Sequence, residues 1–300
     1  MKQRKALLIY NPHAGRGRAA GRAREVARFC KILKTRGLKV EAAQTCAPHD
    51  ATRLAARAAR EDFTDIIVSG GDGTINEALQ GVVGTKASFG VWPRGTANVL
   101  ARELCLPFDV ETAADVIARR VRRQIYLGLA ESARSGERRY FFLMAGIGLD
   151  ASVVSRVRPV LKRHAGEAAF WYSGLEHLAL WKPMPFAVEV EGNEFPATFA
   201  AIGKAPRYGG GLAITPRARL EKAEFEICLI DSESRLRYLR LLAHALRGGV
   251  NFNAPDVRFL RVTRASVTGC NVPVQIDGEL FGQLPMTFEI APHAVEIITP

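Results

Sequence analysis

The residues best suited to chemistry lie in one stretch, 65–76, which reads D-I-I-V-S-G-G-D-G-T-I-N. Its apolar run stops at glycines and helical spacing resumes from Ile75, which predicts a strand, a tight turn and the start of a helix. Gly70, Gly71 and Gly73 are expected to adopt positive φ angles and to let a ligand approach closely. The helix start adds unpaired N–H groups and the positive end of a dipole. The stretch therefore predicts a phosphate-binding loop.

Asp72 stands out in this loop, because a carboxylate beside a phosphate is unfavourable unless a cation lies between them. We therefore interpret Asp72 as an acid that ligates Mg²⁺ or abstracts a proton. The alternative is an ordinary glycine turn with a solvated aspartate.

A second candidate loop, P-R-G-T-A-N at 93–98, follows an apolar stretch at 89–92 and precedes helical spacing over 99–104. The Thr96 hydroxyl could donate to a phosphate, and Asn98 could fix the loop or bind the nucleotide. Both residue types are also common helix caps, so either residue alone is equally compatible with a structural role.

Strands and helices alternate in the N-terminal part of the chain. Apolar runs at 6–10 and 40–45 predict two strands, and helical spacing over 19–36 and 49–61 predicts the helices that follow them. With the strands before the two glycine loops, this alternation indicates an α/β lobe with a parallel sheet. Ligands of such sheets bind beyond the carboxyl ends of the strands, where both loops lie.

The pattern changes after Arg123 to short strands joined by turn signals. Such a series predicts a lobe formed by an antiparallel β-sandwich. We place the domains at 1–123 and 124–300 and allow the last strand to return to the first lobe. The predicted strands are 124–130, 140–145, 186–191, 195–200, 225–230, 257–262, 265–268, 274–276, 286–290 and 295–298.

The composition suits a folded protein with an anionic partner. The formal net charge is +12 and the isoelectric point is about 9.8, which favours a nucleotide, a nucleic acid or an acidic lipid surface. The five cysteines contain no C-x-x-C pair, so neither a disulfide framework nor a zinc site is expected, and a reducing cytosol suits them. No signal peptide or membrane-spanning run is apparent. We therefore expect a cytoplasmic protein that is at most peripheral at the inner membrane surface.

Several motifs occur in order along the chain, namely N-P-H-A-G-R-G, G-G-D-G-T-I-N-E-A, P-R-G-T-A-N-V-L-A-R-E-L-C-L-P, A-G-I-G-L-D-A, Y-G-G-G and I-D-G-E. Together they resemble the diacylglycerol kinase catalytic family, which also contains sphingosine and ceramide kinases, over nearly the whole chain. The resemblance implies a nucleotide-binding lobe like those of NAD kinase and phosphofructokinase, together with a β-sandwich lobe. It also implies ATP and Mg²⁺ as cofactors and phosphoryl transfer to a lipid hydroxyl such as that of diacylglycerol.

The resemblance also implies roles for individual residues. In the family, the acid of G-G-D-G, which is Asp72 here, belongs to the Mg²⁺ and proton-transfer network. Asp277 and Glu279 fall where the family places its catalytic base, and a carboxylate near the alcohol proton is the minimum that the reaction needs. Which carboxylate takes the proton stays open, and Asp277-Gly278 is equally a strong hairpin signal. The implied nucleotide contacts are Asn11, Thr45, Gly70, Gly71, Asp72, Gly73, Thr74, Asn76 and Thr96.

Two further features bear on the lipid. Asp150 falls where related lipid kinases hold a polar head group, although it could instead cap the helix predicted over 151–157. A basic cluster over 156–164 precedes an aromatic segment over 167–181, which could seat the protein on anionic lipid or simply pack in the core.

One departure from the family concerns a second metal site. Many bacterial relatives carry an Asp-Gly pair whose acid joins a structural Mg²⁺ site. At that position, after Pro216 and Ala218, this chain has Lys222-Ala223. Because an ammonium cannot ligate a cation, we predict that this site is absent and that Lys222 supplies a positive charge in its place.

Other functions stay open at this point. The same G-G-D-G loop would serve a kinase of a sphingoid base, another small alcohol or NAD. Gly15-x-Gly17-x-x-Ala20 approximates a dinucleotide-binding motif, but no acid ends the second strand to hold a ribose. The arginines are dispersed without a stacking motif, so no nucleic-acid partner is expected.

The sequence does not specify the acceptor lipid or the oligomeric state, and a homodimer is one of the alternatives.

Overall fold

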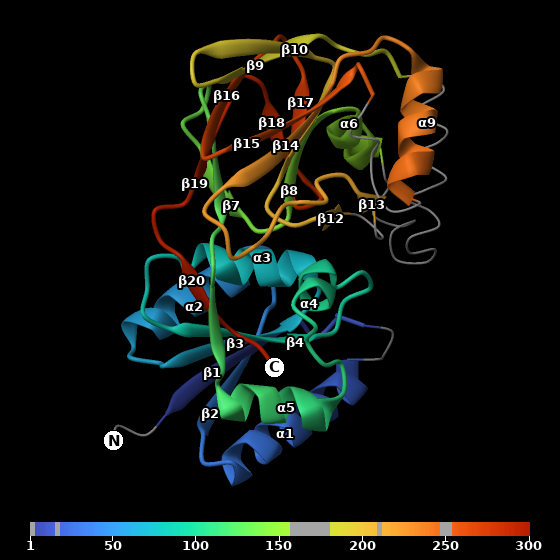
Figure 1. Ribbon diagram of the computed structural model, residues 1–300. Coiled ribbons are helices and arrows are strands. Elements are labelled where there is room, and N and C mark those ends of the chain that lie inside the picture. The colour runs from blue at the N-terminus through green and yellow to red at the C-terminus, as the bar shows by residue number, and fades with distance from the viewer. Residues whose placement is uncertain (1–3, 16–18, 157–180, 209–211, 247–253) are drawn as a thin grey trace. The chain divides into compact units, whose positions relative to one another are not determined.

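The computed structural model describes residues 4–15, 19–156, 181–208, 212–246 and 254–300. These residues fold into two units, Met1–Ile125 with Pro292–Pro300, and Tyr126–Ala291 (Figure 1). The boundary predicted at residue 123 falls inside a strand, β5 (Arg122–Ile125). The last strand of the chain, β20 (Val295–Ile298), lies in the first unit.

The first unit is built on a six-stranded sheet with the order β2-β1-β3-β4-β20-β5. Neighbouring strands are parallel from β2 to β20, and β5 pairs antiparallel with β20. Strand β3 is buried along its whole length, as expected for a central strand with both faces covered. The predicted parallel sheet is therefore confirmed. Its other strands are β1 (Lys5–Tyr10), β2 (Lys39–Gln44), β3 (Asp65–Gly70) and β4 (Ser88–Pro93).

Helices cover both faces of this sheet (Figure 1). Helices α1 and α5 pack together over one face, and α2 and α3 pack together over the other. The core beneath α1 and α5 contains Phe29 and Trp92, whose rings stack with centroids 4.3 Å apart. The bounds of these helices are α1 (Ala19–Thr35), α2 (Asp50–Arg60), α3 (Asp72–Gln80) and α5 (Val110–Arg119).

The second unit is a sandwich of two six-stranded sheets, with the orders β10-β9-β16-β19-β6-β7 and β15-β14-β11-β8-β17-β18. Their paired strands are antiparallel, so the predicted sandwich is confirmed. A short β-ribbon, β12–β13, and helices α6 and α9 complete the described part of this unit. The bounds are β6 (Gly128–Ser132), β7 (Arg138–Phe141), β8 (Met144–Gly148), α6 (Leu149–Arg156), β9 (Phe186–Val190), β10 (Asn193–Ala197), β11 (Phe199–Gly203), β12 (Arg207–Tyr208), β13 (Leu212–Ala213), β14 (Phe225–Ile230), α9 (Arg235–Leu246), β15 (Val257–Val262), β16 (Arg264–Thr268), β17 (Pro273–Ile276), β18 (Glu279–Gln283) and β19 (Met286–Ile290).

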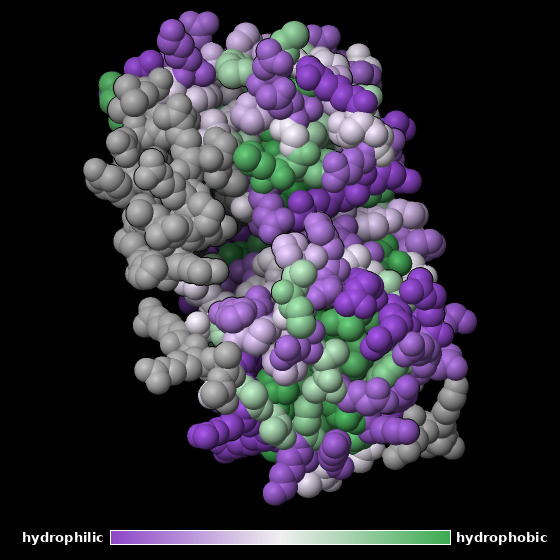
Figure 2. Space-filling model, turned by 180° about the vertical axis from the view of Figure 1, so that it is seen from behind, coloured by the Kyte–Doolittle hydropathy of each residue, from purple (hydrophilic) through white to green (hydrophobic). Residues whose placement is uncertain are grey.

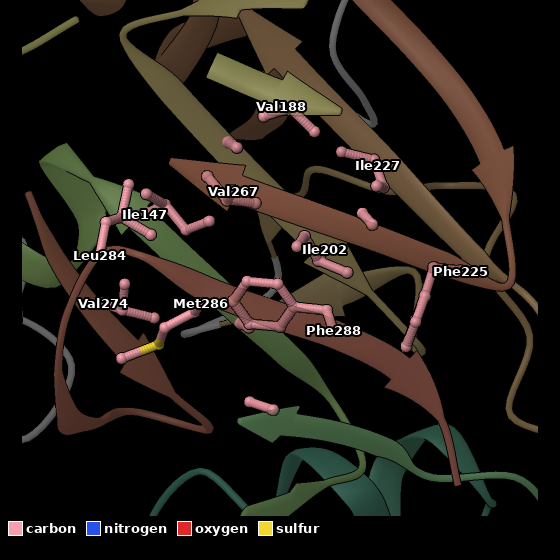
Figure 3. Packing of buried hydrophobic residues seen from close by; sticks show 14 of the residues in the cluster. Ile147, Val188, Ile202, Phe225, Ile227, Val267, Val274, Leu284, Met286 and Phe288 are labelled. Carbon is pink, nitrogen blue, oxygen red and sulfur yellow. The ribbon is translucent and has the colours of Figure 1, made fainter. Parts of the chain in front are cut away.

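The two sheets of the sandwich enclose one apolar core (Figure 3). Ile147 and Val274 come from one sheet, whereas Val188, Val267 and Phe288 come from the other, and all five are fully buried. Buried and less buried side chains alternate along β16, as they must when one face of a strand packs on the core.

Apolar runs that continue across turns conceal strand boundaries in the sequence. The predicted strand 124–130 is two strands, β5 and β6, which pair in different units. Likewise, 140–145 spans parts of β7 and β8, and 195–200 spans parts of β10 and β11. Helices α5 and α9 were not predicted. The first begins after Asp109, whose carboxylate accepts a hydrogen bond of 2.8 Å from the Thr112 N–H.

Within the described ranges, no helix is both long and apolar enough to cross a membrane. The face shown in Figure 2 intersperses hydrophilic side chains with smaller apolar areas. The aromatic segment predicted at 167–181 lies outside the described residues except for Trp181, which is buried and packs edge to face against Tyr238. Residues 157–164 of the predicted basic cluster also lie outside them.

Candidate active site

Loops at the carboxyl ends of β1, β3 and β4 meet in the first unit. The Asn11 N–H donates to the Ser69 carbonyl at 3.0 Å, and the Arg94 N–H donates to the Gly70 carbonyl at 2.8 Å. Asn11 Nδ2 also donates to Thr74 Oγ1 at 3.4 Å. Three residues predicted to bind nucleotide, Asn11, Gly70 and Thr74, are therefore brought together at the sheet edge where α/β proteins bind ligands.

The glycines of this region differ from the prediction in their backbone conformation and in what they approach. Gly70, Gly71 and Gly73 do not have positive φ angles, and the φ of Gly71 is −92°. Instead, two loops touch backbone to backbone, since a Cβ added to Gly95 would lie 2.4 Å from the Gly71 Cα. A Cβ on Gly70 would lie 2.7 Å from the Cβ of Thr74. The prediction of positive φ was wrong, and Gly70 and Gly71 closely approach the neighbouring helix and loop, respectively.

Asp72 joins the two glycine loops through its carboxylate. Its oxygens accept hydrogen bonds from the N–H groups of Val99 at 3.2 Å and Leu100 at 3.3 Å, which begin helix α4 (Val99–Glu103). Burial raises the pKa of Asp72, while these backbone hydrogen bonds act against the rise. Asp72 is thus a helix cap that holds the G-G-D-G loop to the P-R-G-T-A-N loop.

Asn98 fixes the second loop, which is one of the two roles considered for it. Its buried side chain accepts a hydrogen bond from the Gly95 N–H and donates one to the Gly95 carbonyl, both at 2.7 Å. The backbone of Asn98 is left-handed, with φ 48°, where the loop turns into α4. Thr96 is exposed within the loop that Asn98 holds.

Two other nucleotide candidates differ in their surroundings. Thr45 follows β2, and its N–H donates to the Tyr10 carbonyl at 2.9 Å, so it lies at the same sheet edge as Asn11. Asn76 is buried in α3, where its Oδ1 accepts a hydrogen bond from Gln80 Nε2 at 3.0 Å. This hydrogen bond joins successive turns of α3, so Asn76 stabilises the helix.

A buried arginine in α1 lies at this edge and was not identified from the sequence. Arg22 is only 4% exposed, and its Nη2 donates to Ser69 Oγ at 2.5 Å. Its guanidinium carbon lies 4.7 Å from the centroid of the Trp92 ring, and Glu25 forms ion pairs with both Arg22 and Arg94. This network connects the end of β3 to the loop after β4. No local pattern in the sequence indicates these contacts.

In the second unit, Asp277 begins the turn from β17 to β18, so the predicted D-G hairpin is present. Its carboxylate accepts three backbone hydrogen bonds, from the N–H groups of Phe142 at 3.0 Å, Leu143 at 2.9 Å and Met144 at 3.0 Å. These three backbone N–H groups hold the carboxylate in place. Asp277 thus anchors the turn to the start of β8.

Glu279 lies just beyond this turn in a different environment. Its side chain is exposed and forms an ion pair with Arg139. The adjacent Leu280 is also exposed, an unusual position for a large apolar side chain. The structure therefore distinguishes two acids that were equivalent in the sequence, because Asp277 is held by backbone donors and Glu279 is accessible from solvent.

Asp150 is connected to the same turn through a glutamine. Gln275 Nε2 donates to Asp150 Oδ2 at 2.5 Å, and Gln275 Oε1 accepts a hydrogen bond from the Gly278 N–H at 2.7 Å. Gly146 makes room for this contact, since a Cβ there would lie 1.9 Å from Asp150 Oδ2. Burial raises the pKa of Asp150 to about 6, although the bond from Gln275 favours the charged form.

Replacing Asp150 with Asn is expected to stabilise the protein near neutral pH. Between about pH 4 and 6 the folded chain keeps a proton that the unfolded chain releases, so the stability contributed by Asp150 falls as pH rises through this window. Asn removes that penalty and can still accept the Gln275 bond. The variant should gain about 2 kcal/mol at pH 7 and almost nothing near pH 4, as measured by urea unfolding. A gain that is the same at both pH values would contradict this environment for Asp150.

A second lysine, Lys204, contacts the loop in which Lys222 was predicted to supply a positive charge. The Lys222 side chain is exposed, whereas its backbone carbonyl accepts a hydrogen bond from Lys204 Nζ. The ammonium group that donates to carbonyl groups of this loop belongs to Lys204, and the charge predicted for the Lys222 side chain stays a prediction.

Comparison with known proteins covers both units. A model of the "Diacylglycerol kinase catalytic domain" matches residues 5–130, which include both glycine loops. A model of the "YegS C-terminal NAD kinase beta sandwich-like domain" matches residues 144–299, which include Asp150, Asp277 and Glu279.

Individual relatives match along almost the whole chain. The diacylglycerol kinase of Mycobacterium tuberculosis (strain H37Rv) is 31% identical over 301 residues, which cover 99% of this chain and 95% of the relative. That of Bacillus subtilis (strain 168) is 28% identical over 303 residues, with 99% and 97% covered. The crystal structure of a putative diacylglycerol kinase from Bacillus anthracis is similar in fold, with a TM-score of 0.77, 21% identity and 100% and 98% of the chains covered.

Proposed function

The chain belongs to the diacylglycerol kinase family, and we propose that it transfers the γ-phosphoryl group of ATP to the hydroxyl group of a lipid such as diacylglycerol. The observation that carries the proposal is the junction of the two glycine loops, which are held by the Asp72 cap and by the contact of Gly71 with Gly95. A rigid backbone cradle at the ends of parallel strands suits a polyphosphate, because its N–H groups need no rearrangement to bind. Relatives named as diacylglycerol kinases support a lipid as the acceptor.

Groups of the first unit would hold ATP. Gly73 and Thr74 lie in the first turn of α3, where N–H groups lack partners within the helix and attract phosphate oxygens. The hydroxyl of the exposed Thr96 is a further donor, and Asn11 and Thr45 lie at the same sheet edge. Gly70 and Gly71 contribute by allowing the close packing of the cradle, and Asn76 by supporting α3.

Mg²⁺ fits the first unit through Asp72. A carboxylate has about four lone-pair directions, and the two hydrogen bonds to α4 leave others for a metal or its water. Mg²⁺ is commonly held by one or two carboxylates together with substrate phosphates, so a single acid is sufficient. When bound, the metal would neutralise charge on the phosphoryl group during transfer.

Glu279 would accept the proton of the lipid hydroxyl. An alcohol is a poor nucleophile at neutral pH, and a carboxylate within hydrogen-bond reach of its proton increases its reactivity. Glu279 is exposed and is oriented by its ion pair with Arg139. The carboxylate of Asp277 is instead held by three backbone N–H groups, so its role would be to position the turn.

The second unit also carries groups suited to the lipid. Asp150 would bind a polar head group or hydroxyl, and the exposed Leu280 beside Glu279 would contact an acyl chain. The net charge of +12 favours an anionic lipid surface, so we place the reaction at the cytoplasmic surface of a membrane.

The proposal is tested by ADP formation with a panel of acceptors in the presence of Mg·ATP. The panel contains diacylglycerol, monoacylglycerol, sphingoid bases, ceramide and polyprenols in mixed micelles, together with NAD and soluble alcohols. We expect ADP formation that depends on a lipid, and a loss of about 10²-fold in Asp72→Asn. Asp109→Asn is the matched control, because Asp109 caps α5 in the same unit, and it should retain activity. Turnover with NAD or a soluble alcohol and with none of the lipids would overturn the lipid assignment.

A further inference from the structure

Lys204, which follows β11, is a completely buried lysine with 0% of its surface exposed. None of the ion pairs formed among the described residues involves it. A buried ammonium without a carboxylate partner is strongly unfavourable unless other polar groups replace its water. The surroundings of its Nζ atom therefore decide what this residue does.

Three backbone carbonyl groups replace the water around Lys204. Its Nζ donates to the Arg219 carbonyl at 3.3 Å, to the Glu224 carbonyl at 3.0 Å and to the Lys222 carbonyl. An ammonium has three N–H donors and no acceptor, so donors and carbonyls match one to one. Burial lowers the pKa of Lys204 to about 8, while Glu224 and Glu221 oppose this shift, and the ammonium is still the main form at pH 7.

Converging carbonyl oxygens are also how proteins hold hard metal cations. We propose that the loop 216–224 encloses an internal cation site, which the chain fills with its own Lys204 ammonium and which needs no metal ion. In this site Lys204 is a positioning residue, and its influence on catalysis rests on the proposed kinase function.

Backbone hydrogen bonds connect this cation site to the acid turn. The N–H groups of Lys204 and Ala205 donate to the Leu143 carbonyl at 2.8 Å and 3.1 Å. On the other side of the same residue, the Leu143 N–H donates to Asp277 Oδ1 at 2.9 Å. A shift of Lys204 would therefore move the segment that anchors Asp277 and, through the turn, Glu279.

The loop also has anchors that do not depend on the ammonium. Thr215 Oγ1 donates to the Ala205 carbonyl at 2.8 Å, and the Leu220 carbonyl accepts a hydrogen bond from the Tyr126 N–H at 2.8 Å. The Arg217 N–H donates to a carboxylate oxygen of the buried Glu226 at 2.6 Å. A shortened side chain at position 204 should therefore leave a space lined by carbonyl oxygens rather than a collapsed loop.

The first test compares Lys204→Met with Lys222→Met, which removes an exposed ammonium from the same loop. Lys204→Met should lower the melting temperature by about 5–10 °C, because three carbonyls lose their donor, whereas Lys222→Met should match the wild type. In the lipid kinase assay, Lys204→Met should lower kcat about 10-fold or more and leave the KM for ATP within about 2-fold, because the nucleotide groups lie in the other unit. Equal stability and kinetics of the two variants would overturn the proposal.

The second test uses Lys204→Ala and added K⁺, Mg²⁺ or Ca²⁺ without nucleotide. At least one of these cations should raise the melting temperature of Lys204→Ala by several degrees more than that of the wild type or Lys222→Met. The wild-type melting temperature should not change when EDTA is added. A destabilised Lys204→Ala that no cation restores, or a wild type that EDTA destabilises, would refute the cation site. If the cation effects appear but the wild type phosphorylates no lipid, the site stands and the proposed function fails.

Discussion

Replacing Glu279 with Gln is expected to lower kcat by about 10²- to 10⁴-fold while leaving thermal stability almost unchanged. Gln keeps the size of the side chain but cannot accept the proton of the lipid hydroxyl at neutral pH. The carboxylate is exposed and its partner is Arg139 at the protein surface, so the fold depends little on it. The measurement is the rate of phosphoryl transfer at saturating ATP and lipid, together with a melting curve.

Asp277→Ala is the matched variant, and it should mainly lower stability rather than the rate of phosphoryl transfer. Three backbone N–H groups of buried residues, at 142–144, lose their acceptor, so the free energy of unfolding should fall by about 3 kcal/mol. Activity should fall only as far as the turn loses its position. If Glu279→Gln turns over at the wild-type rate, or if Asp277→Ala is as stable as the wild type, these two roles are assigned wrongly.

Gly95→Ala should weaken ATP binding by at least about 10-fold and lower the free energy of unfolding by about 1–3 kcal/mol. The added Cβ would lie 2.4 Å from the Gly71 Cα and 2.9 Å from Asn98 Oδ1. Because the first of these atoms belongs to the backbone, the loops have to separate, and the bonds from Asp72 to Val99 and Leu100 would be stretched. Equilibrium binding of Mg·ATP and urea unfolding measure the two effects.

Gly21→Ala is the control for this substitution. Gly21 lies inside α1, and a Cβ there would meet no atom within 4 Å. Alanine favours the helix by about 0.5–1 kcal/mol over glycine, so this variant should be slightly more stable than the wild type and bind ATP equally well. Comparable losses of ATP affinity in both variants would show that the junction of Gly71 with Gly95 is not what shapes the nucleotide site.

The architecture could be predicted because its signals are local. The apolar run 66–68 and the glycines that end it specify a buried strand and a turn, and the alternation with helices indicates a parallel sheet. Strand boundaries were harder to predict wherever apolar residues continue through a turn. The chain passes from the first unit to the second within the run 124–130. No pair of turn-forming residues separates β5 from β6 in the sequence.

The positions of the site residues could be predicted better than their contacts. The pattern located Asp72 where a strand passes into a helix and Asp277 in a turn, but their partners are distant in sequence, at Val99 and Leu143. The burial of Arg22 and Lys204 is likewise fixed by tertiary packing, and lysine and arginine are ordinarily expected at the surface. Such contacts lie beyond what periodicity or spacing can indicate.

The most direct measurement follows the γ-phosphoryl group when the protein is given diacylglycerol vesicles and NAD together, with Mg²⁺ and ATP labelled in that group. The proposed lipid kinase activity predicts that the wild type places the label in a phosphorylated lipid of the organic phase and that Glu279→Gln leaves it in ATP. Label found only in a water-soluble product, or equal labelling of lipid by wild type and Glu279→Gln, would contradict it.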